Sequence, residues 1–181
     1  MPRRPIKIKR KLIPDPIYNL EKVSKFINFI MRRGKKTTAM RIFYNTMDEI
    51  NKRLDPKNFE SIQTRFNKIR EQRKLIHEPL KDKAIDCWEK ALKNISPDVE
   101  VRTKRVGGAS YQIPHEVREP RKSSLGARWL LSAARMKKGK PMHIKLAEEI
   151  IAATKNEGEA IKKKENIRRM AEANRAFAHF A

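Results

Sequence analysis

Cysteine, histidine and long apolar runs are all scarce in this chain of 181 residues. The single cysteine, Cys87, excludes a disulfide within the chain and is typical of proteins of a reducing compartment. One cysteine and four scattered histidines do not offer zinc-binding spacing, so we expect neither a metal nor a cofactor. No apolar run approaches the roughly 18 residues of a membrane-spanning helix, and the basic start lacks the apolar core of a signal peptide. We therefore expect no membrane partner.

Patterns that indicate catalysis are also missing. No pair of carboxylates lies in an apolar setting, and no Ser or Cys nucleophile is flanked by glycines in an elbow. The segment Gly34-Lys35-Lys36-Thr37 resembles part of a phosphate-binding loop. However, the first glycine of that motif is absent, and a predicted helix precedes it where the motif has a strand. We therefore predict that the protein is not an enzyme, and we assign no catalytic residue.

Positive charge is what the sequence has in excess. Lys and Arg number 44 against 21 Asp and Glu, which gives a formal net charge of +23. Such an excess destabilises a compact monomer by self-repulsion unless a polyanion neutralises it, so nucleic acid is the expected partner. A hydrophobic content of 39% with helical periodicity indicates a folded protein and not a disordered basic tail.

The periodicity predicts a mainly α protein: a single helical domain of about six or seven helices with one protruding β-hairpin, over residues 14–181. A basic arm over residues 1–13 precedes it, for which RNA contact and a plain solvated tail are the alternatives. Asn19 is the expected N-cap of the first helix. Helices are expected at about 20–32, 38–53, 79–94, 118–137 and 159–177, and another is expected to begin at 141. A further basic amphipathic helix is expected at about 58–78, and its function is open.

The one clear β signal lies between Val99 and Val117. Valines and a threonine alternate with charged residues, Gly107-Gly108 supplies a turn, and a second alternating run begins at Tyr111. Three cations, Arg102, Lys104 and Arg105, crowd the approach to the tip. The pattern predicts a basic hairpin in which Tyr111 either stacks on a base or packs across the strands.

Basic clusters recur along the chain, which suits many phosphate contacts over a large surface. A helix-turn-helix regulator usually confines its charge to one recognition helix, whereas here the charge is distributed, which favours RNA. A DNA-binding or chromatin-like regulator is the alternative, and an RNA-modifying enzyme ranks third because no candidate site supports it.

Several motifs together resemble one known family. They are Pro14-Asp15-Pro16, Phe26-Ile27-Asn28, Gly34-Lys35-Lys36, VEVRTKRVGGASYQIPHEVR from Val99 to Arg118, and RMAEANRAFAHF from Arg169 to Phe180. In this order they are similar to the small-subunit ribosomal protein number seven family, of bacterial or organellar type. The resemblance covers nearly the whole chain, although the segment at about 58–78 is longer than the usual bacterial connection.

The resemblance implies a structural ribosomal protein that binds the 3′ major domain of small-subunit rRNA and nucleates assembly of the subunit head. It implies a location in the ribosome, cytoplasmic or alternatively organellar. It also implies exit-site tRNA, mRNA and the neighbouring proteins nine and eleven as partners.

The site residues that follow from the resemblance fall into three sets. The rRNA-binding set is Arg3, Arg4, Lys7, Lys9, Arg10, Lys11, Arg32, Arg33, Lys35, Lys36, Arg118, Arg121, Lys122, Arg128, Arg135, Lys137 and Lys138. The set near tRNA and mRNA is Arg102, Lys104, Arg105, Val106, Gly107, Gly108 and Tyr111. The protein-partner set is Ala171, Asn174, Phe177 and Phe180.

Overall fold

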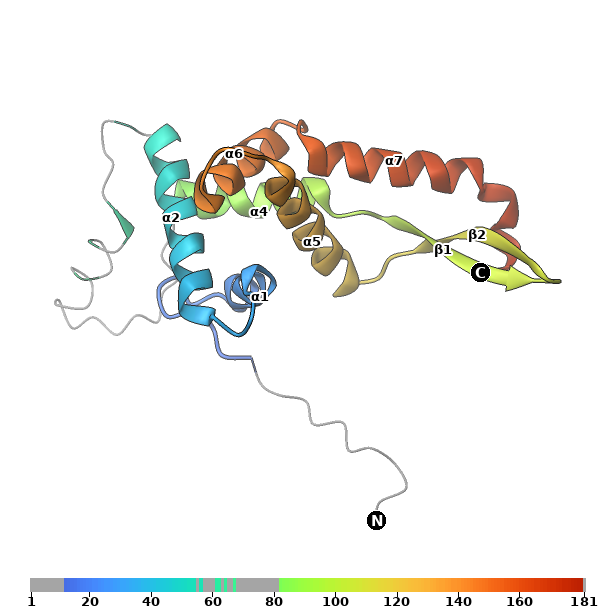
Figure 1. Ribbon diagram of the computed structural model, residues 1–181, viewed down its shortest axis with the longest axis horizontal. Coiled ribbons are helices and arrows are strands. Elements are labelled where there is room, and N and C mark those ends of the chain that lie inside the picture. The colour runs from blue at the N-terminus through green and yellow to red at the C-terminus, as the bar shows by residue number, and fades with distance from the viewer. Residues whose placement is uncertain are drawn as a thin grey trace, which may run out of the picture.

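Six α-helices and one β-hairpin form the part of the chain that the computed structural model describes, which is residues 12–54, 56, 61, 62, 64, 67 and 82–180 (Figure 1). This confirms the predicted fold class. Most of the arm and most of segment 58–78 lie outside the described residues, so those two expectations stay predictions. The elements are α1 Glu21–Ile30, α2 Lys36–Leu54, α4 Lys83–Ile95, β1 Val99–Val106, β2 Ala109–Glu116, α5 Arg121–Met136, α6 Met142–Thr154, α7 Glu159–Ala173 and the 3-10 helix η2 Arg175–Phe180.

The start of α1 differs from the prediction. Asn19 is not the N-cap, because the cap position falls at Leu20, where no side chain caps the helix. Asn19 instead has a positive φ of 51°, and its N–H donates to the Asp15 carbonyl at 2.8 Å. The Asp15 carboxylate also accepts the N–H groups of Ile17 and Tyr18, each at 3.1 Å. The turn before α1 is therefore organised by Asp15, and Asn19 only closes it.

The core of the helical body is built around three aromatic rings. Phe26 of α1, Phe43 of α2 and Trp88 of α4 meet edge to face, with ring centroids 5.3 to 5.8 Å apart. All three are at most 1% exposed. Such pairs contribute about 0.5–1.5 kcal/mol each beyond the burial of their area. The helical spacing therefore brings segments more than 60 residues apart into one packed centre.

The hairpin forms where the alternation predicted it. Strands β1 and β2 are antiparallel, with Val99 opposite Glu116 and Val106 opposite Ala109. Gly107 and Gly108 form the turn, with φ values of 58° and 88°. Two consecutive residues of positive φ are characteristic of a type I′ turn, which matches the right-handed twist of the strands.

The hairpin does not stand alone. It extends away from the helical body, and α7 runs beside it in the same direction (Figure 1). The predicted last helix is too long, because α7 ends at Ala173 and the chain tightens into η2. The segment η2 folds back onto β2. The C-terminal part of the chain thus covers one side of the hairpin.

The Gly107 φ generates a prediction about the turn. An added Cβ would meet nothing within 4 Å, so only the backbone conformation opposes a side chain there. We expect Gly107→Val to destabilise the hairpin by about 1–2 kcal/mol, since β-branched residues avoid positive φ. We expect the control Gly107→Asn to be tolerated, because asparagine adopts this conformation readily. Amide hydrogen exchange over residues 99–117 measures both, and equal protection in the two variants would contradict the prediction.

Candidate nucleic-acid interface

The connection between α1 and α2, taken together with the first residue of α2, presents four exposed cations, Arg32, Arg33, Lys35 and Lys36. None of them forms an ion pair with a carboxylate of the described residues. Arg33 and Gly34 both have positive φ, 52° and 72°, which folds the connection tightly between the two helices. Sequence reasoning predicted this cluster and the positive φ of Gly34. Four charges on one short turn, close to the start of a helix, form a surface suited to backbone phosphates.

The cations at the start of α5 have acidic partners within the chain. The Arg121 guanidinium donates to both carboxylate oxygens of Glu100, at 2.8 and 3.0 Å. Lys122 pairs with Asp98, just before β1. These two predicted rRNA-binding residues therefore tie α5 to the base of the hairpin, although the Arg121 side chain remains 53% exposed.

Further along α5, two guanidinium groups turn toward α1. Arg128 lies over the ring of Phe29, with 5.6 Å from its central carbon to the ring centroid. Arg135 donates to the carbonyl of Ile30 at 3.3 Å and to that of Phe29 at 3.5 Å, at the C-terminal end of α1. Burial lowers the pKa of Arg135, and the nearby positive charge of Arg32 lowers it further. The structure therefore brings together cations that the sequence separates by about a hundred residues.

Three further cations flank α5, with Arg118 before its start and Lys137 and Lys138 after its end, and one of them is neutralised. Lys137 pairs at 2.7 Å with Glu149 of α6, whose side chain is 1% exposed. Sequence reasoning missed Glu149. Arg118 and Lys138 are exposed, and neither pairs with a carboxylate in the described part of the chain. The predicted arm residues, Arg3 to Lys11, lie outside it.

In the hairpin, Arg102 differs from the other two predicted cations. Its Nε donates to Glu100 at 2.6 Å, so it shares that carboxylate with Arg121. Lys104 and Arg105 are exposed near the tip, and Arg105 donates to the Gly108 carbonyl at 3.3 Å across the turn. Of the three, Lys104 and Arg105 are the two that lie exposed close to the tip.

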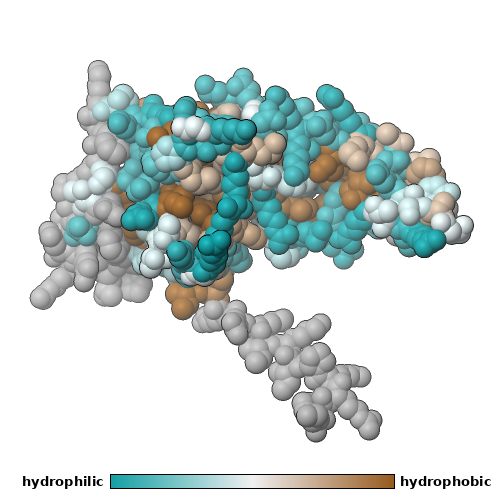
Figure 2. Space-filling view, in the orientation of Figure 1, coloured by the Kyte–Doolittle hydropathy of each residue, from teal (hydrophilic) through white to brown (hydrophobic). Residues whose placement is uncertain are grey.

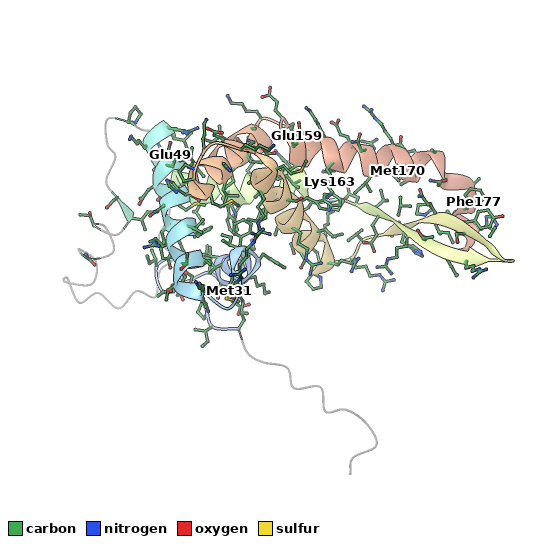
Figure 3. All side chains as sticks on the ribbon, in the orientation of Figure 1. Met31, Glu49, Glu159, Lys163, Met170 and Phe177 are labelled. Carbon is green, nitrogen blue, oxygen red and sulfur yellow. The ribbon has the colours of Figure 1, made fainter. Side chains whose placement is uncertain are left out.

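Tyr111 and Phe177 pack on each other, with ring centroids 5.0 Å apart and planes inclined by 45°. Phe177 points from η2 toward the strands (Figure 3). Ala171, also predicted to face a protein partner, is only 6% exposed. The Asn174 side-chain amide donates to the Met170 carbonyl at 2.8 Å. Of Phe180, the structure describes only the backbone. Ala171 and Phe177 therefore make contacts within the chain. Tyr111 packs on an aromatic ring from outside the sheet, whereas the two predicted alternatives were stacking on a base and packing across the strands.

The visible face of the molecule is largely hydrophilic, with small apolar patches (Figure 2). No group of three potential metal ligands lies among the described residues, and none of the helices found there is long and apolar enough to cross a bilayer. Burial raises the pKa of the Cys87 thiol, which disfavours a reactive thiolate. Open cations on the α1–α2 connection and a basic hairpin define a protein of the nucleic-acid-binding class.

Comparison with known proteins specifies the family. Residues 2–175 match the family model of ribosomal protein S7p/S5e. The small ribosomal subunit protein uS7 of Thermosipho melanesiensis is 47% identical over 171 residues, 94% of each chain. That of Rhodopirellula baltica is 48% identical over the same length and coverage. That of Chloroflexus aggregans is 45% identical over 180 residues, 99% of this chain and 98% of its own.

The chain therefore belongs to the uS7 family of structural small-subunit ribosomal proteins, of bacterial type. This is not a family of enzymes, and it places the chain in the ribosome. The resemblance read from the sequence motifs is confirmed, and the DNA-binding regulator has no support from these matches.

The Glu100 carboxylate generates a prediction. Burial by itself would raise the pKa of Glu100, but hydrogen bonds from Arg121 and Arg102 hold it below its ordinary value of 4.5. The stabilisation is therefore complete above pH 4.5 and is lost as the pH falls through the lowered value. We expect Glu100→Gln to destabilise the protein by about 1–2 kcal/mol at neutral pH, since two guanidinium groups lose their charged acceptor.

Glu116, exposed on β2 of the same hairpin, supplies the matched control. Glu116→Gln removes the same charge without breaking a described ion pair, so we expect little change in stability. Chemical unfolding at pH 7 and at pH 3.5 compares the two variants with the unmodified protein. Equal unfolding midpoints for the two variants at pH 7 would show that Glu100 does not hold the hairpin.

Proposed function

We propose that this protein binds the 3′ major domain of small-subunit rRNA directly and nucleates assembly of the subunit head. The observation that carries the proposal is the cluster on the α1–α2 connection, where four exposed cations lack acidic partners in the described part of the chain. Arg128 and Arg135 of α5 lie against the end of the helix that leads into it. Phosphates spaced along RNA suit such a surface, because each contact releases counterions.

The hairpin serves a second partner in this proposal. Exit-site tRNA and the mRNA leaving the subunit lie near its tip, where Lys104 and Arg105 of β1 are exposed just before the tight turn. The proposed protein neighbours are small-subunit proteins nine and eleven, the latter beside the C-terminal segment. Since Phe177 packs on Tyr111, the surface offered to protein eleven consists of the side chains that remain exposed around it.

The α1–α2 cluster generates the first test. We expect Arg33→Ala with Lys35→Ala to weaken binding to a transcript of the 3′ major domain. We also expect it to flatten the dependence of log affinity on log salt, by about 0.7–0.9 for each phosphate that the variant no longer neutralises. The matched control is Lys162→Ala with Arg168→Ala, two α7 cations already paired with Glu159 and Glu172. An unmodified protein that does not sediment with small subunits at moderate salt would refute the proposal.

The hairpin generates the reciprocal test. We expect Lys104→Ala with Arg105→Ala to leave the affinity for the 3′ major domain within about twofold, because phosphate anchoring is assigned to the body. We expect the same change to lower the occupancy of deacylated tRNA in the exit site of reconstituted subunits. Both double variants remove two positive charges, so charge alone does not distinguish them. If this variant lost as much rRNA affinity as the variant of Arg33 and Lys35, the hairpin would be part of the surface that anchors the rRNA, and the proposed division of roles would be wrong.

A further inference from the structure

A surface hollow of about 310 Å³ lies between the end of α1 and the last turns of α5. Its apolar walls come from Phe29, Leu131 and Met136. Phe29 lies off the apolar stripe of α1 and is only half-buried, so sequence periodicity gives it no role. Met136 is 72% exposed, which is unusual for a large apolar side chain in so charged a protein. Apolar surface is thus left uncovered at one place on α5.

The charged side chains that the structure describes around this hollow are all positive. Among the described residues, Arg128 and Arg135 line it, and no carboxylate does. Arg32 adds a third positive charge close enough to act on Arg135. Such like charges repel one another unless an anion lies among them. The larger groove between α1 and α4 differs, because Asp86, Glu89, Asp98 and Glu119 line it together with its lysines. Charge complementarity therefore selects the hollow, and not the groove, for an anionic ligand.

We infer that this hollow binds a single unpaired nucleotide of the small-subunit rRNA, with its base on the apolar wall of Phe29 and Met136 and its phosphate beside Arg32 and Arg135. The inference rests on the proposed function. The planar Arg128 group already lies over the Phe29 ring, and guanidinium and aromatic planes are the surfaces on which unpaired bases stack. A duplex offers no free base to such a hollow, so the site selects a looped or bulged nucleotide.

The test uses a pair of exposed methionines. Met136→Glu puts a negative charge and a polar group into the hollow, whereas Met170→Glu makes the same change on α7, where Met170 is 43% exposed. We expect Met136→Glu to weaken binding of the full chain to the 3′ major domain transcript at least tenfold, and Met170→Glu to weaken it less than about threefold. Met136→Leu keeps the apolar wall and should retain affinity. Circular dichroism shows whether each variant is folded.

A second readout identifies the nucleotide. Chemical probing of the transcript should show an unpaired base that the unmodified protein and Met136→Leu protect and that Met136→Glu leaves reactive. Equal affinities of Met136→Glu and Met170→Glu, with unchanged base protection, would overturn the inference and leave the proposed function standing. Intact RNA binding by Met136→Glu together with failed recruitment of a neighbouring protein would also overturn it, in favour of a protein occupant. If the unmodified protein does not bind the transcript, the proposed function fails, and this inference fails with it.

Discussion

Four buried carboxylates hold the places where one element of this protein meets the next. Each is at most 9% exposed, and a buried carboxylate without partners would cost several kcal/mol, so each fixes the groups around it. Asp15, in the turn before α1, accepts a hydrogen bond from the Tyr44 hydroxyl of α2. Asp82, at the start of α4, accepts one from the Asn51 side chain of α2. Glu100 joins β1 to Arg121 of α5, and Glu149 of α6 accepts the Ala160 N–H at the start of α7.

The same arrangement shapes the outside of the molecule. The chain has 21 acidic residues for 44 basic ones, and the acids at these joints neutralise only the cations beside them. Arg121 and Lys137 are thereby used within the protein, and Lys122 is paired with the exposed Asp98, whereas the α1–α2 connection has no described acid to oppose its charge. Stability and polyanion binding are thus linked. The carboxylates that stabilise the joints between elements neutralise the cations beside them, so unopposed positive charge remains only elsewhere on the surface.

Local patterns predicted the elements well, because apolar spacing and turn residues act over a few positions. The α1 stripe, the Gly107-Gly108 turn and the hairpin register all follow from neighbours in sequence. Contacts between distant residues were not predictable in this way. Tyr111 meets Phe177 across 66 positions, and nothing near Glu149 in the sequence indicates that Lys137 and the start of α7 enclose it. The cation set stays a prediction, and only the structure separates its paired members from the open ones.

An isolated two-stranded hairpin is at best marginally stable in water. This one is held at its base, where Arg121 and Arg102 share Glu100, and along β2, where Phe177 packs on Tyr111. Its tip still projects from the body, so the exposed Lys104 and Arg105 are presented on a strand pair that is already ordered (Figure 1). The protein therefore loses little conformational entropy when a partner binds the tip. The C-terminal segment therefore contributes to the hairpin by orienting it, before any neighbouring protein is present.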